Sequence, residues 1–161
     1  MVKRASTLGL MLATAAGVLF LAGPASAGEG AAAKKDAPKT EAAKKHKVVF
    51  HFNEADAKKA GVVLTNIQNF VDVVGWESIE ALELVTHGPG LQPFLKETMD
   101  PDVKGKLDKL MAGGLKVGVC GITMKRQQIK PESIPEGATQ VTSGQVRLVE
   151  LQEAGYVYIK P

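Results

Sequence analysis

Segments typical of strands alternate with segments typical of helices from residue 48 to the end of the chain. The expected strands are short apolar runs, and the expected helices repeat their apolar residues every three or four positions. Because the connections are short, consecutive strands run parallel and the intervening helices cover both faces of their sheet. The pattern predicts an α/β fold, namely a three-layer α/β/α sandwich with a mostly parallel five-stranded sheet.

The boundaries of these elements follow from capping and turn residues. Asp100 is placed to cap the second helix, with Pro101 at its first position, and Gly75 and Gly155 end the first and last helices. The expected strands cover residues 48–52, 79–86, 115–119, 138–141 and 156–159. The expected helices cover residues 57–74, 101–112, 124–129 and 145–154, with a helical turn at 91–95.

The start of the chain has the composition of a cleavable signal peptide. Lys3 and Arg4 precede an apolar run over residues 8–22, and a site of small residues for signal peptidase ends at Ala27. As a helix the run spans roughly 22 Å, short of the ~30 Å core of a bilayer. We therefore expect residues 1–27 to be removed, no permanent membrane anchor to remain, and the protein to be periplasmic or secreted.

Residues 28–47 are rich in Ala and Lys and hold no large apolar side chain, which predicts a flexible tether before the α/β domain of residues 48–161. The net charge of +3 comes from the N-terminal part. From residue 48 onward, twelve Lys and Arg stand against fourteen Asp and Glu. This balance, without a basic stripe carrying aromatic residues, argues against a nucleic-acid partner.

Cys120 is the one cysteine in the sequence, so no intramolecular disulfide can form. In an oxidising compartment such a thiol is buried and inert, paired between chains, or kept for chemistry. Cys120 stands at the expected end of the third strand, just before an expected helical turn. Backbone N–H groups there would lower the thiol pKa, and Lys125 and Arg126 would add positive potential.

Other side chains with useful chemistry fall near the ends of the first two strands. His51 and Asn53 close the first, and His87 follows the second. If these strands and the third are neighbours, their ends share the sheet edge where ligands bind in open parallel sheets. Each residue also has a structural interpretation: Cys120 as a small core residue, and His51 as a hydrogen-bonded strand residue.

Some classes of site are not indicated. Two histidines, Cys120 and Met124 could suit Cu(I), but they lack a compact ligand spacing, and Met124 more simply packs in the core. The sequence has no glycine-rich phosphate loop, no paired-acid motif and no Ser-His-Asp order. We therefore expect no metal and no cofactor.

Five segments together resemble the DsrE/DsrF-like family, whose members share the YchN-like fold. They are VVFHFN from residue 48, NIQNFVD with Asn66 and Asn69, VTHGPGL around His87, VGVCGIT around Cys120, and the ending SGQVRLVELQEAGYVYIKP. Their order is kept over about 115 residues. The resemblance implies a parallel α/β sandwich that assembles into homo-oligomers, commonly trimers or hexamers.

The resemblance also implies a role for the cysteine. In sulfur-relay members of the family, a cysteine at the position of Cys120 accepts sulfur as a persulfide and passes it on between a donor and an acceptor protein. Thr123 and Lys125 would stabilise the thiolate. The residues expected to line the pocket are His51, Asn53, His87 and Gly88. The better-known members are cytoplasmic, so an export signal departs from the family pattern.

Three hypotheses stay open from the sequence. The first is a periplasmic persulfide carrier, without a dedicated cofactor, whose status as an enzyme is left undecided. The second is a non-enzymatic oligomeric binding module for a soft metal or a small thiol, and the third is a structural oligomer in which Cys120 is inert.

Overall fold

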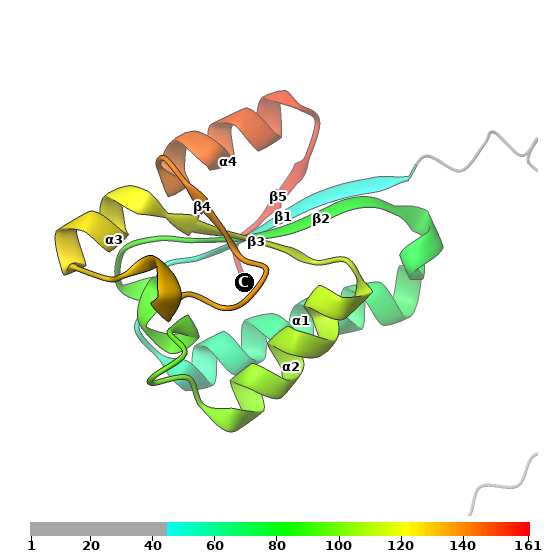
Figure 1. Cartoon of the computed structure of the whole chain (residues 1–161). Coiled ribbons are helices and arrows are strands. Elements are labelled where there is room, and N and C mark those ends of the chain that lie inside the picture. The colour runs from blue at the N-terminus through cyan, green and yellow to red at the C-terminus, as the bar shows by residue number, and fades with distance from the viewer. Residues whose placement is uncertain (1–44) are drawn as a thin grey trace, which may run out of the picture. The chain divides into compact units, whose positions relative to one another are not determined.

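The computed structural model describes residues 45–161, which form one sheet between two layers of helices (Figure 1). The expected signal peptide and most of the expected tether lie outside the described residues. The strands are β1 (His46–Phe52), β2 (Ile79–Thr86), β3 (Lys116–Cys120), β4 (Thr139–Val141) and β5 (Val157–Ile159). The α-helices are α1 (Ala57–Val74), α2 (Pro101–Gly113), α3 (Gly121–Gln127) and α4 (Gly144–Glu153), and the 3₁₀ helices are η1 (Trp76–Ser78), η2 (Gly88–Phe94) and η3 (Pro131–Ser133).

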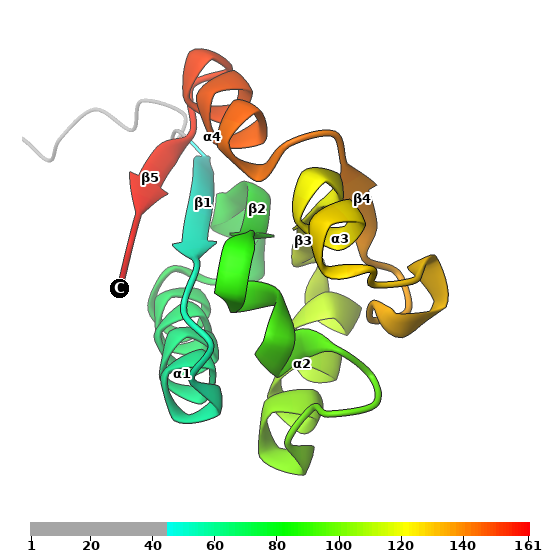
Figure 2. The ribbon, with the colours of Figure 1, turned by 90° about the vertical axis from the view of Figure 1, so that its left-hand side faces the viewer.

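All five strands are parallel, in the order β4-β3-β2-β1-β5. Figure 2 looks along the sheet and shows α4 on one side of the strands and α1 and α2 on the other. The α/β sandwich predicted from the alternating pattern is therefore confirmed. Because β1, β2 and β3 are neighbours, their carboxyl ends share one edge of the sheet, which is the condition for a common site.

The face covered by α1 and α2 carries most of the core. Alternate residues of the three central strands point to it and are almost fully buried, because successive side chains of a strand point to opposite faces. These strand residues are Val48, Phe50, Phe52, Leu82, Leu84, Val117 and Val119. Helix α1 adds Val63, Leu64, Ile67 and Val71, spaced at the three- and four-residue intervals that the sequence showed.

The opposite face is covered more thinly, by α4. Its apolar cluster has four buried members, namely Val49, Val85, Leu148 and Leu151. The remaining inward positions on this face carry functional groups: His51 on β1, Glu83 on β2 and Cys120 on β3 are all buried. The sheet thus has a large apolar core on one face, and on the other a small apolar cluster beside three buried side chains that carry polar or titratable groups.

Among the strands and α-helices, two begin at least two residues before the expected position. Strand β1 begins at His46, so it includes two residues that the composition assigned to the tether. Helix α3 begins at Gly121 rather than Met124. Gly121 is a poor helix former, but a Cβ there would lie 2.8 Å from Nε2 of Gln140 and 3.0 Å from the carbonyl oxygen of Val141. Contact with β4 therefore requires a glycine at the helix start.

Two short 3₁₀ helices were not predicted from the sequence. The 3₁₀ helix η1 places the Trp76 indole against Gly113, where a Cβ would lie 2.4 Å from Cζ2 of the ring. The second 3₁₀ helix not predicted, η3, follows Lys130 in the connection to β4. Across residues 45–161, no helix combines the length and the hydropathy that crossing a membrane requires.

Candidate functional site

The side chains predicted at the strand ends lie together on the α4 face of the sheet edge. Thr86 of β2 pairs with Val119 of β3, so the next residues, His87 and Cys120, follow side by side. An ideal Cβ built on Gly144, the first residue of α4, would lie 2.9 Å from Cβ of His87 and 3.3 Å from Cβ of Cys120. Three chain segments therefore meet around the sulfur atom.

Cys120 is buried, with 5% of its surface exposed, yet it belongs to neither apolar cluster. Burial raises the pKa of its thiol. The hydroxyl of Thr123 and the backbone N–H groups of Gly144, Thr123 and Ile122 act in the opposite direction and outweigh burial, so the pKa lies below its ordinary value. Hydrogen-bond donors around the sulfur favour the charged form, which is the nucleophilic form of a cysteine.

The orientation of the Thr123 hydroxyl is fixed by the loop after β2. Its oxygen accepts a hydrogen bond of 2.8 Å from the backbone N–H of Gly88. A lone pair of the hydroxyl is then occupied, which leaves its proton available for the sulfur of Cys120. Gly88 has a φ of 56°, in the left-handed region that glycine adopts without strain, so the sequence of the turn supports this contact.

His51, His87 and Tyr158 form a second group beside the cysteine. The Nε2 atoms of His51 and His87 are 2.7 Å apart, and the rings stack with their centroids 4.7 Å apart. Nδ1 of His51 is 2.7 Å from the hydroxyl oxygen of Tyr158 on β5. In a hydrogen bond between two imidazole nitrogens, one nitrogen carries the proton and the other accepts it. Two neutral rings can therefore form this contact.

The environment keeps both rings neutral. Burial, followed by the nearby His87 and Lys160, lowers the pKa of His51 to about 4. Burial and Lys160 also lower the pKa of His87. At neutral pH the group beside Cys120 is therefore an uncharged chain of hydrogen bonds, and not a source of positive charge.

The other predicted residues take different places. Asn53 is half-buried just after β1, and its backbone lies against η2, where a Cβ on Gly90 would be 2.6 Å from Cα of Asn53. Lys125 is exposed in the last turn of α3 and is not among the groups that act most strongly on the thiol. The structure thus brings together His51, His87, Gly88, Cys120 and Thr123, and places Asn53 and Lys125 outside this group.

The arrangement gives no support to a soft-metal site. Among residues 45–161, no three His, Cys, Asp or Glu side chains are grouped as metal ligands would be. Met124, the fourth ligand considered, is buried in the core on the opposite face of the sheet. The Nε2 atoms of His51 and His87 contact each other, and Nδ1 of His51 contacts the hydroxyl of Tyr158.

Several residues of the site were not identified from the sequence. Gly144 was missed because its role depends on how α4 crosses the ends of β2 and β3. Tyr158 was missed because it lies 107 residues from His51. Glu83 did give a signal: it is a charged residue inside an apolar strand, and the structure shows it buried and paired with Arg147 of α4.

Comparisons with known proteins identify a family and a similar solved structure. The sequence model of the DsrE/DsrF-like family matches residues 18–161. The solved structure of MTH1491, a protein of unknown function from Methanobacterium thermoautotrophicum, is 26% identical, with a TM-score of 0.65. The alignment covers 73% of this chain and 100% of that chain. No curated protein gives a significant match.

Proposed function

The chain belongs to the DsrE/DsrF-like family, which is associated with sulfur relay, and on that premise we propose that it carries sulfane sulfur as a persulfide on Cys120. The observation that carries the proposal is the set of donors around the sulfur. A buried thiol with no such donors would stay protonated and inert, whereas this one has a lowered pKa.

The proposed step is a transfer between sulfur atoms. The Cys120 thiolate attacks the outer sulfur of a donor persulfide, a new S–S bond forms on Sγ, and the S–S bond of the donor breaks. The donor leaves as a thiolate, so the electron pairs balance and no external oxidant or reductant is required. The donor and the acceptor are proposed to be thiols of partner proteins. Because only 5% of Cys120 is exposed, we expect disulfide formation between two copies of the chain to be slow.

Intact-protein mass spectrometry after incubation with inorganic polysulfide tests this proposal. The wild-type protein is expected to gain about 32 Da, the mass of one sulfur atom, and dithiothreitol is expected to remove it. Cys120→Ala, which removes the sulfur and little volume, is the matched control and should gain nothing. An unchanged wild-type mass, or the same gain in the control, would refute the proposal.

Assembly into a homo-oligomer, a trimer or a hexamer, is part of the proposal. It is supported by exposed apolar side chains on both sides of the sheet: Val146 and Val149 of α4 are each 53% exposed, and Val157 of the edge strand β5 is 61% exposed. Sedimentation equilibrium is expected to give a multiple of the chain mass, and Val149→Glu to reduce it. A wild-type monomer at micromolar concentration would contradict this.

Export is also proposed, from the composition of residues 1–27. N-terminal sequencing of the protein secreted or released from the periplasm by its native host is expected to begin at Gly28. Recovery of the uncleaved chain from the cytoplasm would oppose it.

A further inference from the structure

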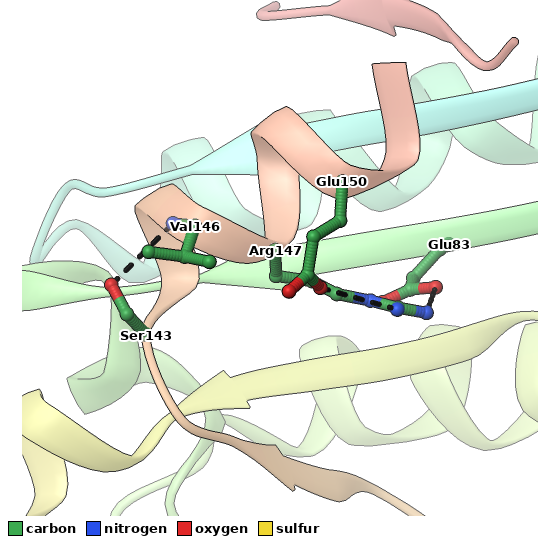
Figure 3. Close-up of polar contacts among 5 residues, drawn as sticks. All are labelled: Glu83, Ser143, Val146, Arg147 and Glu150. Carbon is green, nitrogen blue, oxygen red and sulfur yellow. Dashed lines mark hydrogen bonds and ion pairs between the residues drawn. The ribbon is translucent and has the colours of Figure 1, made fainter. Parts of the chain in front are cut away.

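A partly buried ion pair connects β2 to α4 on the face of the sheet that carries Cys120. Glu83 of β2 is 3% exposed, and Nε and Nη2 of Arg147 lie 2.9 Å and 2.8 Å from its two carboxylate oxygens (Figure 3). This two-pronged geometry fixes the guanidinium in both distance and direction. The neighbouring strand makes room for the carboxylate with Gly118, where a Cβ would lie 3.0 Å from Oε1 of Glu83.

The other hydrogen bonds at the start of α4 are local to the helix itself. Oγ of Ser143, the N-cap residue, accepts from the N–H of Val146 at 3.5 Å, the long limit of a hydrogen bond (Figure 3). The backbone N–H of Arg147 donates to the carbonyl of Ser143 at 2.9 Å and closes the first turn. Arg147 is thus joined to Ser143 through its backbone and to the sheet through its side chain, so the ion pair fixes the first turn of α4 to β2.

Gly144 lies in that first turn, between His87 and Cys120. An ideal Cβ on Gly144 would lie 2.9 Å from Cβ of His87 and 3.3 Å from Cβ of Cys120, which leaves no room for a side chain. The backbone of Gly144 therefore packs directly against His87 and Cys120. The backbone N–H of Gly144 is also one of the groups that lower the pKa of the Cys120 thiol. A small outward movement of α4 would lengthen this contact without disturbing the donors of α3.

We propose that Glu83 and Arg147 are positioning residues, whose ion pair holds the backbone N–H of Gly144 against the sulfur of Cys120. The inference rests on the proposed function in taking Cys120 as the reacting group. Its experiment measures the thiolate itself and needs no sulfur transfer, so failure of one proposal is distinguishable from failure of the other.

Glu83→Gln tests the proposal because two explanations predict opposite results. The substitution removes a negative charge from the face that carries Cys120 and leaves Arg147 unneutralised, so a purely electrostatic effect would favour the thiolate. Loss of positioning would disfavour it. We expect iodoacetamide to alkylate Cys120 of this variant about three- to tenfold more slowly at pH 6, and at a rate closer to that of the wild type at pH 10, above the pKa of about 8.5 for a free cysteine.

Arg147→Lys provides a second variant that keeps the charge and loses the planar fork. It is expected to slow alkylation at pH 6 in the same direction, and it keeps the test decisive if Glu83→Gln does not fold. Glu150→Gln is the matched control on the same helix: it removes an exposed carboxylate 3.8 Å from Arg147 and should leave the rate unchanged. Wild-type rates in both folded test variants, or faster alkylation in Glu83→Gln, would overturn the proposal.

Discussion

Replacing Arg147 with alanine is expected to lower the free energy of unfolding by about 2–4 kcal/mol, the largest effect of a single substitution near the site. The loss comes from Glu83, whose carboxylate would stay buried without its partner. Breaking a fully buried pair costs about 3–5 kcal/mol, but the Arg147 side chain is 34% exposed, so water compensates in part. Urea denaturation measures the change.

A double substitution separates the ion pair from the space that it fills. Glu83→Met combined with Arg147→Met removes both charges and keeps similar volumes, so it should recover most of the stability lost in Arg147→Ala. Glu150→Ala, which removes the exposed partner of Arg147, should change stability by less than about 0.5 kcal/mol. A loss in Arg147→Ala no larger than in Glu150→Ala would show that Glu83 does not depend on its pair.

Lowering the pH from 7 to 4 is expected to remove about 2–3 kcal/mol of stability through His51 alone. Its folded-state pKa of about 4 lies below the ordinary value of 6.5, so between these values the unfolded chain binds more protons than the folded one. The contribution is complete above pH 6.5 and is lost as the pH falls through 4. His87, Tyr158 and Lys160 face the ring, and none of them offers a negative charge to the protonated form.

The variant His51→Gln isolates this effect from the carboxylates, which also titrate in this range. Because glutamine does not ionise, its unfolding free energy should fall less steeply between pH 6.5 and pH 4 than that of the wild type. Parallel curves for the two proteins would mean that His51 titrates in the folded protein as it does in the unfolded chain.

The fold was predictable because its signals are local. The spacing of Val63, Ile67 and Val71 marks the buried face of α1, and Asp100 caps α2 as expected. The order of the strands was not encoded locally, so the meeting of His51, His87 and Cys120 at one edge could only be stated as a condition. The structure meets that condition through the adjacent positions of β1, β2 and β3.

The parts of the site that could not be predicted depend on contacts between distant residues. Arg147 lies 64 residues from Glu83, and Tyr158 lies 107 residues from His51. Gly144 shows the difficulty best: next to Ser143 it suggests a helix start, and only the packing of α4 against β2 and β3 brings its backbone against His87 and Cys120. Secondary structure follows from local pattern, whereas this site follows from the crossing of three segments.

The rate at which iodoacetamide alkylates native wild-type Cys120, followed from pH 4 to pH 10, tests the central claim most directly. The donors around the sulfur predict that the rate reaches half of its plateau below the pKa of about 8.5 for a free cysteine. The same curve for Thr123→Val, which loses the hydroxyl and keeps the shape, should move toward higher pH. A wild-type thiol that reacts only above pH 9, or not at all, would contradict a reactive thiolate at the edge of this sheet.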